Sequence, residues 1–134
     1  MNKITNAWLL VAWDTLHLAD VEQGATTWWC ADRRCAVSDR CFVYKPRKGI
    51  VLLFEILRMT EAEGFCRSFG MGTAEIKILK VFKVPISAKA LKQSRAVKNE
   101  KFVRNNFQSK SFQLRDKSVV EAILTLSTSH HKKN

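Results

Sequence analysis

Residues 38–57 read SDRCFVYKPRKGIVLLFEIL, and this stretch predicts a β-hairpin around which the other elements are arranged. The apolar segments 41–44 and 50–57 both have the length and composition of buried strands. Between them, Pro46 and Gly49 are the residue types that a tight connection requires. We therefore expect two antiparallel neighbouring strands here, joined by these turn residues.

Shorter strands are predicted on both sides of the hairpin, at residues 7–12, 26–30, 74–84, 102–104 and 111–114. The candidate strand 74–84 alternates imperfectly, and a bulge or bend near Leu79 reconciles its two halves. Pro85 is expected to end that strand. Residues 61–72 contain three of the five glycines, so they are expected to form a loop.

Helical segments are fewer and lie between or after these strands. Residues 15–23 predict one or two helical turns, and residues 87–93 predict a short helix with Ser87 as its N-cap. Asp116 is expected to cap a helix over residues 116–126. Short strands with a few helices predict an α+β fold: a small, partly closed β-barrel with short peripheral helices.

The chain has 134 residues, of which 46% are hydrophobic and 26% are charged, which is typical of one globular domain. We expect that domain to span residues 1–126, and the polar residues 127–134 to form a frayed tail. No apolar run approaches the roughly 20 residues of a membrane span. No signal-peptide core follows Met1, so a cytoplasmic protein without a membrane partner is expected.

The cysteines are expected to be free, buried thiols in a reducing compartment, and they are Cys30, Cys35, Cys41 and Cys66. A zinc site is the alternative, but four and five residues separate the first three cysteines, unlike the Cys-x₂-Cys spacing of structural zinc sites. A domain of this length also buries enough surface to fold without a metal or a disulfide. Neither a metal nor a cofactor is expected.

The formal net charge of +11 predicts a partner of opposite charge. Residues 80–110 contain nine basic side chains and one acidic side chain, Glu100, a pattern typical of nucleic-acid binding. The residues expected to contact phosphates are Lys80, Lys83, Lys98, Lys101, Arg104, Asn105 and Lys110. A solvated surface that only keeps the protein soluble is the alternative.

The sequence contains no pattern that predicts catalysis. His17 and the pair His130-His131 have no companions at the spacing of a catalytic triad or a metal pair. Gly70-Met71-Gly72 matches only a fragment of a phosphate-binding loop and precedes a strand rather than a helix. We therefore expect a binding protein rather than an enzyme.

Four tryptophans lie within the first 29 residues, and an exposed indole can stack on a base for roughly 1–3 kcal/mol. Trp8 lies in an apolar segment and is expected in the core, whereas Trp13 borders loop-like sequence. Trp28 and Trp29 are adjacent on a predicted strand, so one is expected to pack inward while the other lines a surface or cleft. The alternative is that both pack in the core.

Trp28-Trp29, the segment 38–44 and the Gly49-Ile50 return together resemble the PUA-like superfamily, and within it the EVE branch, which is related to YTH domains. The apolar segment 7–11 is similar to the opening strand of that family. Ser38-Asp39-Arg40 is similar to its Gly-Asp turn, with Ser38 in place of the glycine. Later similarities are to the family's Pro-containing segment with its short helix and to its late hairpin, at residues 84–92, 102–106 and 111–114.

The resemblance implies a small β-barrel that holds a nucleobase, often a modified and flipped one, in a pocket with aromatic walls. Trp28 or Trp29 would form one wall, Tyr44 a second wall or rim, and Trp13 is a further candidate. Lys101 and Arg104 would lie where phosphates pass. The implied function is a non-catalytic reader of DNA or RNA. The alternatives are a protein-interaction module or accessory subunit with a basic face, and a component of an RNA-modification enzyme.

Overall fold

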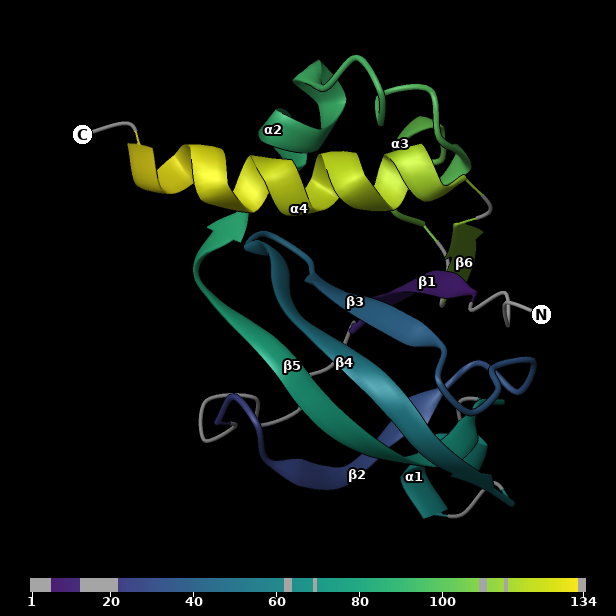
Figure 1. Cartoon of the computed structure of the whole chain (residues 1–134). Helices are drawn as coiled ribbons and strands as arrows, with labels where there is room; N and C mark the ends of the chain where they lie inside the picture. The colour runs from purple at the N-terminus through teal and green to yellow at the C-terminus, as the bar shows by residue number, and fades with distance from the viewer. Residues whose placement is uncertain are drawn as a thin grey trace, which may run out of the picture.

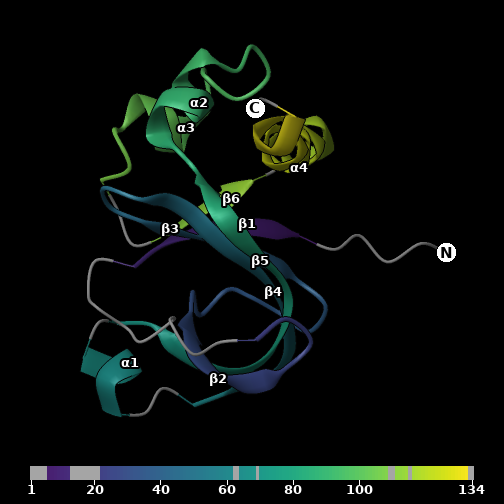
Figure 2. The same cartoon turned by 90° about the vertical axis from the view of Figure 1, so that its left-hand side faces the viewer.

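The structure, a computed structural model, describes residues 6–12, 22–61, 64–68, 70–108, 111–114 and 116–132. The strands in these ranges are β1 (Ala7–Val11), β2 (Thr26–Ala31), β3 (Arg40–Lys45), β4 (Gly49–Thr60), β5 (Gly72–Ile86) and β6 (Ser111–Leu114). The helices are α1 (Gly64–Ser68), α2 (Ala88–Gln93), α3 (Lys101–Arg104) and α4 (Lys117–Lys132). Figures 1 and 2 show α2, α3 and α4 together at one end of the sheet, with β2 and α1 at the other end.

The strands form one sheet in the order β2-β5-β4-β3-β1-β6. Neighbouring strands are antiparallel except β1 and β3, which are parallel. Strands β2 and β6 lie at the two edges of this order, so the sheet is not closed by a backbone ladder. The predicted α+β class is confirmed, whereas the predicted barrel is confirmed only in part.

The predicted hairpin is formed by β3 and β4, with Arg40 opposite Glu55 and Lys45 opposite Gly49. Its turn places Arg47 and Gly49 in the left-handed region, at φ 73° and 113°. A side chain at position 49 would overlap the main-chain oxygen of Ile86. Glycine is therefore required at position 49 both by its dihedral angle and by the close approach of the end of β5.

Replacing Gly49 with alanine is expected to lower the free energy of unfolding by at least about 2 kcal/mol, because the strain of positive φ adds to a steric overlap. Gly24→Ala is the matched control, since Gly24 has φ 91° but no atom within 4 Å of an added Cβ. Urea unfolding of both variants separates the two effects. Equal losses of stability would show that the contact with Ile86 relaxes without cost.

Strand β5 contains the expected bulge. Ile78 lies opposite Phe54 and Lys80 lies opposite Leu53, which leaves Leu79 as the extra residue. The strand then continues through Pro85 instead of ending there, and this expectation was wrong. Pro85 falls in a stretch where β4 and β5 lose register, between the pairs Leu52–Val81 and Ile50–Ile86, so no ladder hydrogen bond is lost at the proline.

The sheet is buried on both faces at its centre. One core contains Leu9, Phe42 and residues of α2, α3 and α4; the other contains Trp8, Val43 and residues of β2, β4 and β5. The alternation of β1 explains this arrangement, because Trp8 and Leu10 point into one core while Leu9 points into the other. The two cores thus share β1, β3, β4 and β5.

Residues 102–104 belong to helix α3, so the predicted strand is wrong. Phe102 and Val103 are both buried in the core next to α4, whereas adjacent strand residues point to opposite faces. Asn106 and Phe107 then adopt φ 53° and 60°, and this reversal returns Phe107 to the same core.

Two other segments are more helical than predicted. Helix α1 lies within residues 61–72, which were expected to form only a loop. Helix α4 continues past residue 126 to Lys132, and Ser127 is only 3% exposed. The expected caps are present: Ser87 accepts a hydrogen bond from the amide of Ala90, and Asp116 accepts one from the amide of Ser118. The helix expected at residues 15–23 lies outside the described residues.

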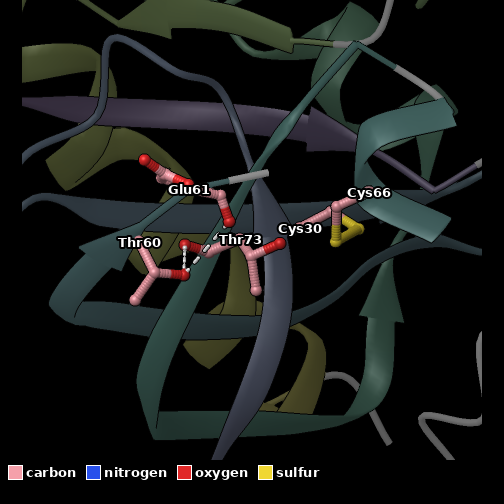
Figure 3. Close-up of a disulfide and its surroundings, with 5 residues drawn as sticks. All are labelled: Cys30, Thr60, Glu61, Cys66 and Thr73. Carbon is pink, nitrogen blue, oxygen red and sulfur yellow. Dashed lines mark hydrogen bonds between the residues drawn. A yellow bond between two sulfur atoms is a disulfide. The ribbon is translucent and has the colours of Figure 1, made fainter. Parts of the chain in front are cut away.

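Cys30 and Cys66 form a disulfide that links β2 to α1, which corrects the prediction of four free thiols (Figure 3). The pairing was not predictable from spacing, because 36 positions separate the two residues and only the fold brings α1 against β2. Cys35 and Cys41 are free and buried, as expected. Nearby, the Thr60 hydroxyl donates to the carbonyl of Thr73, which joins β4 to the start of β5.

Candidate nucleic-acid interface

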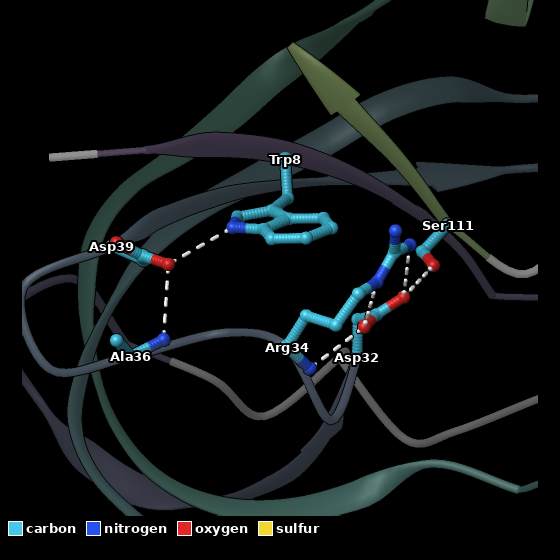
Figure 4. Close-up of polar contacts among 6 residues, drawn as sticks. All are labelled: Trp8, Asp32, Arg34, Ala36, Asp39 and Ser111. Carbon is cyan, nitrogen blue, oxygen red and sulfur yellow. Dashed lines mark hydrogen bonds and ion pairs between the residues drawn. The ribbon is translucent and has the colours of Figure 1, made fainter. Parts of the chain in front are cut away.

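The two edges of the sheet are joined by side chains rather than by a ladder. Asp32 follows β2 directly, Ser111 begins β6, and the Ser111 hydroxyl donates to Asp32 Oδ2 (Figure 4). Arg34 donates to the same carboxylate from Nε and Nη2, each at 3.0 Å, which is the two-point geometry that arginine favours with carboxylates. We call this junction of Asp32, Arg34 and Ser111 the seam.

The seam rests on a buried polar arrangement beneath it. The Arg34 guanidinium lies 5.1 Å from the centroid of the Trp8 ring, a cation–π distance. The Trp8 indole Nε1 donates to Asp39 Oδ2 at 3.0 Å. Asp39 also accepts from the backbone amides of Asn6 and Ala36. These contacts fix Trp8 and, through its ring, the position of Arg34.

A cavity of about 490 Å³ opens beside the seam, within the size range of ligand sites. Its lining residues come from the seam, α3, β6 and the start of α4: Arg34, Glu100, Lys101, Ser111, Phe112, Gln113 and Asp116. We call it the seam cavity. Lys101, Glu100 and Gln113 form no side-chain hydrogen bond or ion pair with any described residue, so their polar atoms are available to a ligand.

The three carboxyl groups around the seam cavity differ in the direction of their pKa shifts and in their hydrogen-bond partners. Hydrogen bonds from Arg34 and then Ser111 lower the pKa of Asp32 to about 2, against the opposing effect of burial. Burial and the negative charge of Asp116 raise the pKa of Glu100. Hydrogen bonds from Ser118 lower the pKa of Asp116. Asp32 is thus a fixed anion neutralised by Arg34, whereas Glu100 is a carboxyl group that lacks a partner.

The low pKa of Asp32 predicts a pH dependence of stability. Since its folded-state pKa of about 2 lies below the usual value, its contribution is complete above about pH 4 and is lost as the pH falls towards about 2. The advantage in unfolding free energy of wild type over Asp32→Asn should therefore shrink over that interval and stay constant at higher pH. Urea unfolding between about pH 2 and pH 7 measures it. A constant difference down to the lowest pH would contradict the role of Asp32 in the seam.

The paired tryptophans point to opposite faces, as strand geometry requires. Trp28 is 48% exposed, and the Arg58 guanidinium lies 5.3 Å from its ring centroid. Trp29 is half-buried against the core that contains Trp8. Trp28 lies on the edge strand β2 opposite Glu75 of β5 and does not line the seam cavity. The strand β2 lies at the end of the sheet away from α2 and α3 (Figure 1).

Tyr44, a further aromatic candidate that the structure describes, is packed in the core. Tyr44 is only 5% exposed, and its ring stacks on Phe107 at a centroid distance of 4.2 Å. Its ring is thus committed to the core beside α3, which corrects the expectation of a wall or rim. Trp13 lies outside the described residues.

The predicted phosphate-binding residues occupy different positions. Lys98, Lys101 and Arg104 are exposed on and before α3, and Lys101 lines the seam cavity. Lys83 is exposed on β5, whereas the ammonium group of Lys80 donates to the Ser127 hydroxyl and lies over the Phe82 ring. Asn105 donates to the carbonyl of Gln108, and Lys110 lies outside the described residues. Of the predicted phosphate-binding residues that the structure describes, Lys101 is the one that lines the seam cavity, and the cavity lining does not include Trp28.

Sequence reasoning missed most of the cavity's lining. Arg34, Ser111 and Gln113 carry no motif, and they meet only because the edges of the sheet approach each other. Glu100 did carry a signal, since it is the single acidic residue within the basic segment 80–110. In the structure that residue lines the seam cavity.

Two other properties can be stated for the described parts of the chain. No helix there is long and apolar enough to cross a membrane. No group of three or more histidine, cysteine or acidic side chains there is arranged to hold a metal ion.

Comparisons with known proteins identify the fold. No model of a known family matches the chain, and no curated protein is significantly similar in sequence. A solved structure from Pseudomonas syringae has a TM-score of 0.70 at 17% identity, over 90% of this chain and 99% of that one. A hypothetical protein from Leishmania major has a TM-score of 0.67 at 14% identity, with coverages of 96% and 98%.

The structure is also similar to the ASCH protein of Zymomonas mobilis, with a TM-score of 0.52 at 16% identity over 90% of this chain and 94% of that one. The ASCH protein has the PUA-like fold, so the fold expected from the sequence resemblance is found, while membership of the superfamily stays a prediction. At these identities the likeness extends to the fold alone. The EVE branch stays a prediction.

Proposed function

We propose that this chain is a nucleic-acid-binding domain without catalytic activity, which holds one base in the seam cavity and phosphates on the basic segment around α3. The observation that carries this proposal is the position of Lys101, which lines the cavity and lies three positions in sequence from each of the exposed Lys98 and Arg104. A nucleotide that places its base in the cavity thereby places its phosphate beside these cations. The likeness in fold to the ASCH protein supports the choice of nucleic acid as the partner.

The dimensions and chemistry of the cavity suit a base. A volume of about 490 Å³ accommodates a nucleoside, and the cavity offers the side chain of Phe112 together with polar groups of both kinds. Taking a base out of a stack costs a few kcal/mol, least for a single strand. Hydrogen bonds in the cavity and phosphate contacts offset that cost.

The proposal also states which kind of base the domain reads and where in the cell it acts. The resemblance of residues 38–50 to the EVE branch supports a reader of a modified, flipped base. The disulfide between Cys30 and Cys66 is more typical of oxidising compartments, so in the expected cytoplasm this pair would be reduced. Binding measured against oligonucleotides with modified and unmodified bases tests the reader function directly.

The primary test is a titration of wild type with short single-stranded RNA and DNA at several salt concentrations, followed by fluorescence anisotropy. We expect the logarithm of the affinity to fall linearly with the logarithm of the salt concentration, with a slope of about −0.7 for each phosphate contacted. No binding to either polymer at about 50 mM salt would contradict the proposal.

Trp28 offers a second place for a base, because its indole is half exposed and Arg58 lies over its ring. We expect Trp28→Ala to change the affinity by less than about twofold, since Trp28 does not line the seam cavity, whereas a lost base stack would cost roughly 1–3 kcal/mol. Anisotropy titrations with the same oligonucleotides measure the change. A loss of tenfold or more, which corresponds to about 1.4 kcal/mol, would show that the base stacks on Trp28 and does not enter the seam cavity.

A further inference from the structure

Three polar side chains that line the seam cavity have no partner among the described residues, and together they form an unusual set. Lys101 is a donor, Glu100 is an acceptor when ionised, and the amide of Gln113 is both. Of the other charged groups there, Arg34 is paired with Asp32, and Asp116 accepts two hydrogen bonds from Ser118 at Oδ1 but keeps its negative charge. A ligand is therefore met by the unpartnered Lys101, Glu100 and Gln113, with the carboxylate of Asp116 as a further lining group.

We propose that the seam cavity selects bases that carry an exocyclic amino group, with the Glu100 carboxylate accepting a hydrogen bond from that group. This inference rests on the proposed function, because it names which bases the same cavity prefers. Cytosine, adenine and guanine carry such a group, whereas uracil and thymine present carbonyl oxygens. Carboxylates are the side chains that pair with the amino group of cytosine in nucleic-acid complexes.

Glu100 and Gln113 both contribute to the discrimination between bases. An amino group donates to Glu100, and the Gln113 amide can pair with the neighbouring ring nitrogen or carbonyl of the same base. A uracil in the same position sets its carbonyl oxygen against the carboxylate, so that two acceptors face each other and both lose their water. The basic segment does not contribute to this choice, because phosphate contacts carry no sequence information.

Glu100 is suited to this role by its surroundings. It precedes α3 but its side chain does not cap that helix, so it is not committed to holding the local fold. Burial and the nearby charge of Asp116 disfavour its ionised form, and a donated hydrogen bond from a base would relieve that penalty. Lys101, the next residue along the chain, remains available for the phosphate.

The test compares oligocytidine with oligouridine RNA of equal length, which differ at the position that Glu100 would read. We expect wild type to bind oligocytidine about tenfold more tightly, as one good base contact allows. Glu100→Gln should reduce the ratio of the two affinities to less than about threefold. The ratio is the readout because removing a negative charge strengthens binding to any polyanion, and this general effect cancels.

Glu121→Gln is the matched control, since Glu121 is exposed on α4 and does not line the cavity; its ratio should equal that of wild type. Equal binding of both polymers to wild type would overturn the inference while leaving the proposed function intact. A preference that persists in Glu100→Gln would overturn the role of Glu100. Binding of neither polymer would mean that the proposed function itself has failed.

Discussion

Neutralising Lys98 and Lys101 together, as Lys98→Gln/Lys101→Gln, is expected to weaken binding of single-stranded RNA by roughly 10- to 100-fold at about 100 mM salt. Both side chains are exposed, so the loss follows from charge and not from unfolding. The same change should make the dependence of the logarithm of affinity on that of salt concentration shallower by about 1.4, that is about 0.7 for each phosphate contact removed. Anisotropy titrations at several salt concentrations measure both quantities.

The matched control is Arg67→Gln/Lys77→Gln. It lowers the net charge of +11 by the same two units, but on α1 and near the start of β5, which lie at the opposite end of the molecule from α3 (Figure 2). We expect this control to change affinity less than about threefold, through the long-range field alone. Similar losses in the two double variants would mean that the charge acts as a diffuse attraction and that α3 does not bind phosphates.

Asp39→Ala is expected to lower the free energy of unfolding by roughly 3–5 kcal/mol, since the buried indole donor of Trp8 loses its acceptor at about 1–3 kcal/mol and the two part-buried amides of Asn6 and Ala36 add to that loss. Asp39 is only 3% exposed, and its carboxylate accepts from the Trp8 indole and from the amides of Asn6 and Ala36. Its removal therefore leaves three donors without an acceptor. Against a typical total stability of about 5–15 kcal/mol, the loss would leave a marginally folded protein.

A double-mutant cycle with Trp8→Phe shows whether the indole contributes as the structure indicates. Trp8→Phe removes one of the three donors, so the double variant Asp39→Ala/Trp8→Phe should lose less stability than the sum of the single variants, by about 1 kcal/mol or more. Urea unfolding supplies all four values. Strict additivity would contradict the coupling between Trp8 and Asp39, and would also remove the support we infer for Arg34.

Elements whose signals lie close together in the sequence were predictable. The hairpin of β3 and β4, the caps Ser87 and Asp116, and the bulge at Leu79 each depend on a few neighbouring residues. The strand expected at Phe102 was wrong because packing decided it: three apolar residues within a short segment had to reach one core, and a helix followed by a reversal does this. Local propensity gives no information about that requirement.

The candidate site was predictable only in its charge. The excess of basic residues in the segment 80–110 predicts phosphate binding there, and Lys101 of that segment lines the seam cavity. Arg34, Ser111 and Gln113 come from three separate stretches, so their meeting depends on the order of strands in the sheet. For the same reason the exposed indole of Trp28, although conspicuous in the sequence, does not line the seam cavity.

The seam joins the two edges of the sheet through a few side-chain hydrogen bonds, whereas a backbone ladder would join them at every residue pair. If a backbone ladder joined the edges, its hydrogen bonds would have to break before the edges could separate. The side-chain hydrogen bonds of the seam can break while every strand keeps its backbone pairing. The seam cavity can therefore widen for a larger ligand at the cost of these side-chain contacts alone, without the loss of any strand pairing. Substitutions at the seam would then lower stability by the contacts removed and also alter the size of ligand admitted.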